Sequence, residues 1–158
     1  MKTFSVENLA RGGIIAALYV VLTYIFAPIS FGLIQVRIAE MLTILPMFTP
    51  MAVPGLFLGC LLGNLLAGAI LPDVVFGSLA TLIGAIGTRL LKKKPMLAWI
   101  PPVLSNAIIV PIVLQKVYGV PDSFWYLMLT VGVGEVIACG VLGLILHQAL
   151  VKAPSVFR

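Results

Sequence analysis

Glu135 is the residue of this sequence with the clearest potential for chemistry. It lies well inside the last long apolar stretch of the chain. A carboxylate at that depth in a lipid bilayer costs roughly 2.5 to 3.5 kcal/mol on insertion scales, so a specific interaction must offset it. Gly132 and Gly134 leave space beside it for a ligand or a second helix. We expect Glu135 either to contact a solute or ion, or to hydrogen bond with Asn106 or Asn64.

A second pair of charged residues, Arg37 and Glu40, lies three positions apart at the start of an earlier apolar stretch. At this spacing two side chains share one face of a helix and can pair with each other. The same two groups could also form a charged mouth that positions a polar solute. The sequence leaves both interpretations open.

Amides and aromatic rings extend the candidate site. Asn64 and Asn106 lie within apolar stretches, where an amide can hydrogen bond with a heterocycle or with helix backbone. Tyr118 and Trp125 lie at the border of such stretches, where aromatic rings mark the membrane interface or stack on a flat ligand. The candidate solute-binding residues are therefore Glu135, Glu40, Arg37, Asn106, Asn64, Tyr118 and Trp125.

The sequence lacks the motifs of known enzyme classes. There is no glycine-rich phosphate loop ending in Lys-Ser or Lys-Thr, no histidine pair for a metal, and no recognisable nucleophile. Cys60 and Cys139 have no partner at metal-ligand spacing, so we expect them to pack within helices without a disulfide. We predict no catalytic residue and no metal site, and no hydrolysis of ATP by this chain.

Hydrophobic helices must position these residues. The chain has 158 residues, of which 61% are hydrophobic and 9% charged, and such a composition requires lipid as the main solvent. The alternation of a membrane barrel is missing, so we predict a single all-α domain, residues 1–158, with six transmembrane helices. The predicted helices cover residues 9–29, 36–48, 51–71, 74–91, 97–114 and 124–150.

Basic residues predict the orientation. Cytoplasmic loops of membrane proteins are enriched in lysine and arginine. A cytoplasmic N-terminus places eight of the ten basic residues inside, leaving Arg37 and Lys116 outside. The eight are Lys2, Arg11, Arg89, Lys92, Lys93, Lys94, Lys152 and Arg158. We therefore expect a multi-pass protein of the cell membrane with both termini cytoplasmic, and no nucleic-acid partner despite the net charge of +5.

Small residues recur at the spacing of close helix contacts. Gly55, Gly59 and Gly63 form a stripe on the third predicted helix, which we expect to pack against another helix of this chain. The first predicted helix has two similar pairs, which indicate either internal packing or docking of a partner protein. Their members are Gly12, Gly13, Ala16 and Ala17.

The early motifs resemble those of a known family. The segment from Gln35 to Glu40 has the sequence QVRIAE and precedes LTILP, and PGLFLGC then leads to Asn64. These motifs, in a small basic protein with six short helices, resemble the substrate-binding S-components of energy-coupling factor (ECF) transporters. More narrowly, they resemble the QueT family of predicted queuosine-precursor transporters. The resemblance extends over most of the chain.

The resemblance implies a function for this chain within a complex. A transmembrane coupling protein and two cytoplasmic ATPases, which hold ATP and Mg²⁺, would drive uptake, while this chain binds queuine or a related 7-deazaguanine. Glu135 or Glu40 would accept from the amide-amidine edge of the ring, and the other would pair with an amine. Asp73, Tyr118 and Trp125 would lie near external loops that cover the solute. The four small residues of the first helix would contact the coupling protein.

Two alternatives stay open at this stage. The chain could be an S-component for another vitamin, such as cobalamin or a B-vitamin, because related S-components share a fold while their pockets differ. It could also be a self-sufficient secondary transporter in which Glu135 binds a proton or sodium ion. A membrane enzyme acting on lipids is disfavoured, because the acidic or histidine clusters that such chemistry needs are missing.

Overall fold

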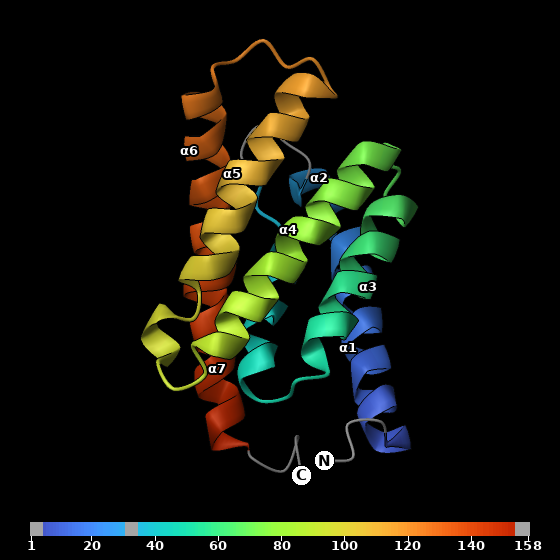
Figure 1. The fold of residues 1–158 in the computed structure, drawn as a ribbon, viewed down its shortest axis with the longest axis vertical. Coiled ribbons are helices and arrows are strands. Elements are labelled where there is room, and N and C mark those ends of the chain that lie inside the picture. The colour runs from blue at the N-terminus through green and yellow to red at the C-terminus, as the bar shows by residue number, and fades with distance from the viewer. Residues whose placement is uncertain (1–4, 31–34, 154–158) are drawn as a thin grey trace.

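The computed structural model describes residues 5–30 and 35–153. Every regular element in these two ranges is helical, which confirms the prediction of an all-α protein (Figure 1). Most are α-helices, whereas η1 and η2 are 3₁₀ helices and η3 is a π-helix. The elements are α1 (Val6–Ile25), α2 (Ala27–Ser30), η1 (Ile38–Met47), α3 (Ala52–Leu66), α4 (Leu71–Leu90), η2 (Pro95–Leu97), α5 (Ile100–Lys116), α6 (Phe124–Glu135), η3 (Val136–Leu142) and α7 (Gly143–Lys152).

Four helices among the described residues are long and apolar enough to cross a membrane: Val6–Ile25, Leu71–Leu90, Pro95–Lys116 and Phe124–Lys152. The last of these comprises α6, η3 and α7 in one continuous rod. The other two predicted spans correspond to η1 and α3, which are shorter. At about 2.0 Å per residue for a 3₁₀ helix and about 1.5 Å for an α-helix, each reaches only about 20 Å. The hydrocarbon core is about 30 Å thick, so neither crosses it alone.

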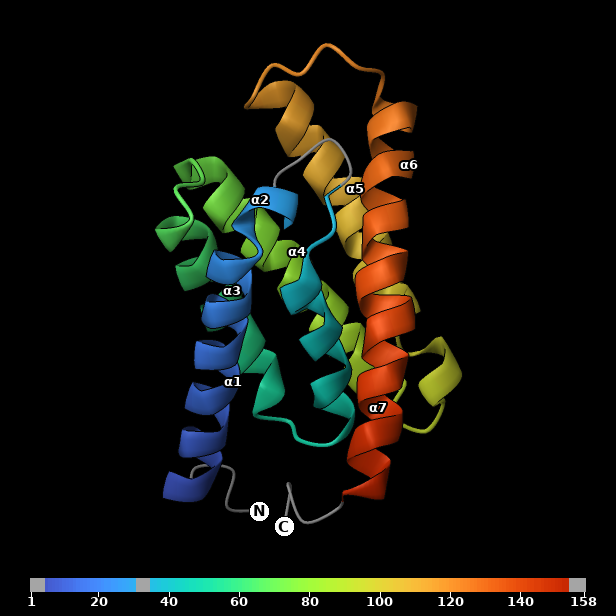
Figure 2. The ribbon, with the colours of Figure 1, turned by 180° about the vertical axis from the view of Figure 1, so that it is seen from behind.

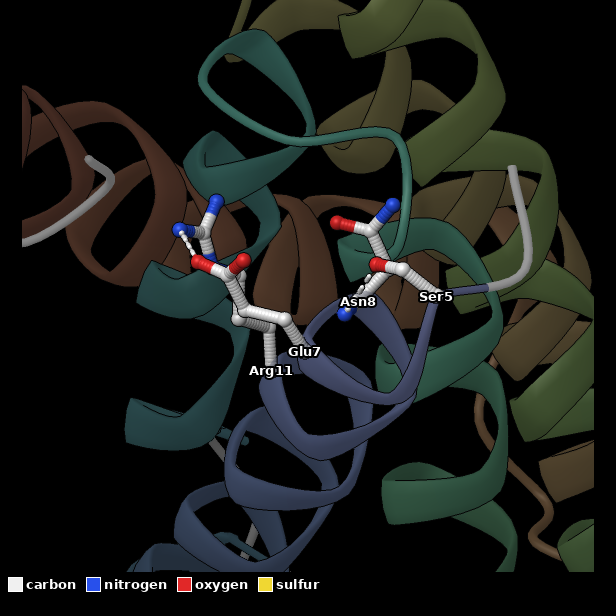
Figure 3. Close-up of polar contacts among 4 residues, drawn as sticks. All are labelled: Ser5, Glu7, Asn8 and Arg11. Atoms are coloured by element: carbon white, nitrogen blue, oxygen red, sulfur yellow. Dashed lines mark hydrogen bonds and ion pairs between the residues drawn. The ribbon is translucent and has the colours of Figure 1, made fainter. Parts of the chain in front are cut away.

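The first helix begins earlier and ends earlier than predicted. Ser5 caps its N-terminus, because the Ser5 hydroxyl accepts a hydrogen bond from the Asn8 backbone amide at 3.2 Å. One turn in, Glu7 and Arg11 form an ion pair (Figure 3). The helix ends at Ile25, and Pro28 lies in the separate turn α2, since proline disfavours continuation of a preceding helix.

The 3₁₀ helix η1 occupies the middle of the bundle, where an α-helix was predicted. It packs against α1, α3, α4, η3 and α7, and Figure 2 shows it between α1 and the rod that ends in α7. Its hydrogen bonds join residues three apart, as from the Glu40 amide to the Arg37 carbonyl at 2.9 Å. Arg37 and Glu40 lie at the border of an apolar stretch in the sequence. Because η1 is buried on nearly every side, both residues lie in the interior of the bundle.

Glycines allow α1 and α3 to approach closely. A Cβ added to Gly55 would lie 2.6 Å from the Gly12 carbonyl oxygen, and one on Gly59 would lie 2.9 Å from the Ala16 carbonyl oxygen. Both distances are shorter than any side chain tolerates, so the stripe is required for backbone contact. The prediction that this stripe packs against another helix of the chain is confirmed.

The ends of the bundle differ in charge. The start of α1 and the end of α7 lie at the same end, which also holds the connection between α4 and α5 (Figures 1 and 2). The connections from α3 to α4 and from α5 to α6 lie at the opposite end (Figure 1). The basic residues at the first end are Arg11, Arg89, Lys92, Lys93, Lys94 and Lys152. Six of the eight basic residues predicted to be cytoplasmic therefore lie at one end, whereas Lys2 and Arg158 fall outside the described residues.

Candidate functional site

Glu40 lies in a polar cluster at the centre of the bundle. Its Oε1 accepts hydrogen bonds from the Tyr19 hydroxyl at 2.5 Å and from the Thr81 hydroxyl at 2.6 Å. Tyr19 belongs to α1 and Thr81 to α4, so three elements converge on one carboxylate. All three residues are 0% exposed. The second carboxylate oxygen of Glu40, Oε2, has no hydrogen-bond partner among the described residues.

Arg37 brings a buried cation to the same cluster. Its Nη2 donates to Asn64 Oδ1 at 2.6 Å and lies 3.8 Å from the Cys60 sulfur. The Asn64 amide in turn donates to the Cys60 sulfur at 3.5 Å, which fixes the orientation of its oxygen toward Arg37. Arg37 also lies near enough to Glu40 and Glu135 to interact electrostatically with both. Two carboxylates therefore lie within electrostatic range of the buried guanidinium.

Glu135 completes the cluster from α6. Its Oε2 accepts from the Cys139 thiol at 3.3 Å, while its Oε1 has no hydrogen-bond partner among the described residues. One oxygen of Glu40, one oxygen of Glu135 and the Cys139 sulfur all lie within 4.8 Å of one another. Glu135 is 0% exposed. Two buried carboxylates thus come together, and within the described part of the chain each keeps one oxygen without a hydrogen-bond partner.

Gly134 explains how Glu135 reaches the segment that carries Arg37. A Cβ on Gly134 would lie 2.1 Å from the Gln35 carbonyl oxygen, so only glycine allows this backbone to lie directly on α6. The π-helix η3 begins immediately after Glu135. Such π segments are rare and are frequently found at functional sites. This contact brings the QVRIAE motif next to the carboxylate.

Asn106 and Trp125, two further predicted site residues, make no hydrogen bond with Glu40 or Glu135 among the described residues. Asn106 is fully buried and donates to the Pro102 carbonyl at 3.1 Å, and its Oδ1 has no partner among the described residues. The predicted hydrogen bond between Glu135 and Asn106 or Asn64 is not present among the described residues. Glu135 accepts a hydrogen bond from the Cys139 thiol instead. Trp125 is 72% exposed and lines an outward-facing apolar groove between α5 and α6.

Tyr118 and Asp73 border the cluster on the side of the loops. The Tyr118 hydroxyl donates to Asp73 Oδ2 at 2.9 Å. Partial burial and the Asp73 carboxylate raise the pKa of Tyr118, so its hydroxyl keeps the proton that it donates. A Cβ on Gly77 would lie 3.7 Å from both Asp73 Oδ1 and Arg37 Nη1. Asp73 and Arg37 therefore both lie next to Gly77.

The four small residues predicted for partner docking divide between two faces of α1. Gly12 and Ala16 pack against α3 through the glycine stripe described above. Gly13 and Ala17 are exposed, and a Cβ on Gly13 would meet nothing within 4 Å. Internal packing thus accounts for one pair, while the other pair leaves a shallow, uncovered face on the helix.

Sequence reasoning missed several residues of the cluster. Tyr19, Thr81 and both cysteines were not assigned to the site, although each contacts a predicted site residue. Cys60 and Cys139 are buried and free, and were expected only to pack. The presence of their polar atoms within apolar stretches was the feature of the sequence that could have indicated a place in the site. The missing information was which helices are neighbours.

The charges of the cluster define what it can bind. With both glutamates ionised, Arg37 balances one carboxylate and leaves one negative charge in a buried site. A buried unpaired charge is costly, so a further cation or a proton must balance it. The unpaired oxygens of Glu40 and Glu135 accept hydrogen bonds, whereas Arg37 and Asn64 can donate them. The cluster suits a polar solute with several donors and a positive charge.

Comparisons with known proteins identify the family. The profile of the QueT transporter family matches residues 9–152. A curated protein of Lactococcus lactis subsp. cremoris (strain MG1363), the queuosine precursor transporter QueT, is 37% identical over 84 residues, which cover 52% of this chain and 47% of the relative. The match thus spans about half the length of that relative. No solved structure matches the chain. Because the family profile covers nearly the whole sequence, this multi-pass membrane protein belongs to the QueT transporter family.

Proposed function

We propose that this chain is the substrate-binding S-component of an ECF-type importer and that it captures queuine or a related 7-deazaguanine from outside the cell. The observation that carries the proposal concerns two fully buried carboxylates, Glu40 and Glu135, near the Arg37 guanidinium. Each has one oxygen without a hydrogen-bond partner among the described residues. Polar groups inside a membrane bundle are costly and mark solute pathways. Family membership and the similarity to the queuosine precursor transporter of Lactococcus lactis support the choice of solute.

The chemistry of a 7-deazaguanine matches this arrangement. One edge of the ring presents an amide N–H and an amino group, which together suit the two oxygens of one carboxylate. The ring carbonyl accepts, so Arg37 and Asn64 supply donors for it. An amine on the ring substituent pairs with the other carboxylate. Glu40 and Glu135 are fully buried here, so the solute enters only when elements around the cluster separate.

The topology proposed for this role has six crossings and a cytoplasmic basic end. In this topology the segments that contain the short elements η1 and α3 serve as the second and third crossings, although neither element spans the hydrocarbon core alone, and the charge difference between the two ends favours this orientation. Two ATPases bind ATP and Mg²⁺ in the cytoplasm, and a transmembrane coupling protein connects them to this chain. The docking surface proposed for that protein is the face of α1 that includes Gly13 and Ala17, with Gly12 and Ala16 at its edge.

Calorimetry on the purified chain tests the solute. We expect queuine or an aminomethyl 7-deazaguanine to bind, and members of a vitamin panel, including cobalamin, to fail. Glu135→Gln should weaken binding about 10- to 100-fold, because it removes one charged hydrogen-bond acceptor. Glu7→Gln is the matched control, since Glu7 lies at the exposed start of α1. Tight binding of a vitamin without binding of any deazaguanine would refute the proposed solute.

Uptake by cells that express the chain tests the mechanism. Under the S-component proposal, uptake of the solute requires the coupling protein and both ATPases and persists when the proton gradient is collapsed. A self-sufficient secondary transporter would show the opposite pattern, with uptake in the absence of the ATPases and loss of uptake when the gradient is collapsed. That result would exclude the ECF mechanism while leaving the binding site in place.

A further inference from the structure

The two carboxylates of the cluster differ in the donors that they receive. Glu40 Oε1 accepts from two hydroxyl groups, Tyr19 at 2.5 Å and Thr81 at 2.6 Å. Glu135 accepts only a thiol hydrogen bond, from Cys139 at 3.3 Å, among the described residues. Hydroxyl donors favour an ionised carboxylate, whereas a thiol is a weak donor. Glu40 is therefore suited to carry the negative charge that balances Arg37.

Glu135 then shares the Arg37 guanidinium with Glu40, and the described residues around it supply no second cation when the site is empty. One oxygen of Glu135 and one of Glu40 lie within 4.8 Å of each other. At so short a distance in a buried site, two carboxylates do not both stay ionised unless a counterion balances each charge. A proton on Glu135 removes the excess charge. An amine cation of the solute would remove it equally well, so the proton and the amine compete for the same carboxylate.

The other ionisable groups around Glu135 do not supply the missing charge. Tyr19 on α1, Cys60 on α3 and Cys139 on η3 are neutral or anionic groups. Asp73 on α4, which lies beside Gly77 as Arg37 does, is an acidic group and supplies no cation. On α7, His147 packs on the Phe48 ring at the end of η1, with ring centroids 5.3 Å apart. On α5, the buried polar group Asn106 is neutral.

We propose that this site selects a solute with one positive charge and that each binding event displaces one proton from Glu135. The inference rests on the proposed solute-binding function and specifies its substrate class: a 7-deazaguanine with a protonated amine, in preference to a neutral one of the same size. In the exchange the O–H bond of the Glu135 carboxyl group breaks, the proton passes to bulk water, and the carboxylate pairs with the ammonium group.

The test compares two solutes that share a ring and differ in charge. The first is 7-aminomethyl-7-deazaguanine, which is a cation at neutral pH, and the second is 7-cyano-7-deazaguanine, which is neutral. Each is titrated into the purified chain by calorimetry in phosphate and in Tris at one pH. The dependence of the observed heat on the ionisation enthalpy of the buffer gives the number of protons released.

We expect the aminomethyl solute to release about one proton and to bind about 10- to 100-fold more tightly than the cyano solute, which releases none. From about pH 6 to about pH 8 the affinity for the cation should rise, by up to about tenfold per pH unit, because the competing proton is lost. Glu135→Gln should release no proton and should lose most of the preference for the cation, whereas Glu7→Gln should behave as the wild type.

Equal affinities for the two solutes, or binding of the cation without proton release, would overturn this inference while leaving the deazaguanine function intact. Failure of both solutes to bind would refute the proposed function itself. The comparison on the wild-type chain is decisive alone, so the inference stays testable if Glu135→Gln does not fold.

Discussion

Substitution of Gly134 by alanine is predicted to break the contact that joins Arg37 to Glu135. The added Cβ would lie 2.1 Å from the Gln35 carbonyl oxygen and 2.7 Å from the Gln35 carbonyl carbon. Carbon and oxygen atoms in contact normally stay at least about 3.3 Å apart, so the Gln35 backbone must retreat by about 1 Å. Arg37 is two residues away and moves with it.

The expected effect follows from three magnitudes. Overpacking of this kind costs about 1 to 3 kcal/mol, while the higher helix propensity of alanine returns up to about 1 kcal/mol. Because the 2.1 Å contact is with backbone, the cost should lie in the upper part of that range, at about 2 to 3 kcal/mol, and we expect a net loss of about 1 to 2 kcal/mol in the free energy of unfolding. Displacement of the Arg37 guanidinium weakens a charged hydrogen bond to the solute, which corresponds to a loss in affinity of about tenfold or more.

Gly132→Ala provides the matched control on the same helix. Its Cβ would lie 3.7 Å from the Ala107 Cβ, an ordinary van der Waals contact, so the change should leave binding intact and should not destabilise the protein. The assays are thermal unfolding in detergent and calorimetric binding of a 7-deazaguanine. If Gly134→Ala unfolds and binds like Gly132→Ala, the close approach of Gln35 to α6 is not what positions the site.

Three further predictions concern the surroundings of the cluster. Tyr19→Phe removes a hydrogen bond to Glu40, so affinity measured by calorimetry should fall about tenfold, and unchanged affinity would remove Tyr19 from the site. Gly55→Ala should lower the melting temperature through a clash with the backbone of α1, whereas Gly13→Ala should not, and equal melting curves would contradict the packing described. Trp125→Leu should leave solute affinity within about twofold of the wild type, because the ring faces outward; a loss of about tenfold or more would place it in the site.

The sequence predicted the residues of the cluster better than it predicted their contacts. Glu135 and Asn64 were singled out as polar groups in apolar surroundings, and Arg37 and Glu40 as a charged pair at the border of an apolar stretch. The structure brings all four together. The cost of burying such groups in a membrane is a local property, so composition and position reveal it.

The partners of these groups depend on topology instead. Thr81 is 41 positions from Glu40, and Cys139 is 96 positions from Thr43, with which it also makes contact. No spacing rule applies at such separations. Tyr19 could equally have faced lipid, because its position on α1 gives no indication of which face meets η1.

The secondary structure shows the same division. Long apolar stretches predicted four spans that the structure describes, with ends shifted by a few residues. The 3₁₀ conformation of η1 was not predicted, because its local sequence pattern does not distinguish it from an α-helix. What sets η1 apart in the structure is its burial among five other elements. The π segment after Glu135 likewise has no sequence signature in this chain.

A structure of the chain with a bound 7-deazaguanine tests the central claim most directly. The account predicts that the solute lies between the carboxylates of Glu40 and Glu135, with an oxygen of each within hydrogen-bond distance of a ring or amine nitrogen, about 3 Å. Arg37 or Asn64 should contact the ring carbonyl. A solute bound instead in the apolar groove beside Trp125, with the carboxylate cluster still closed, would contradict it.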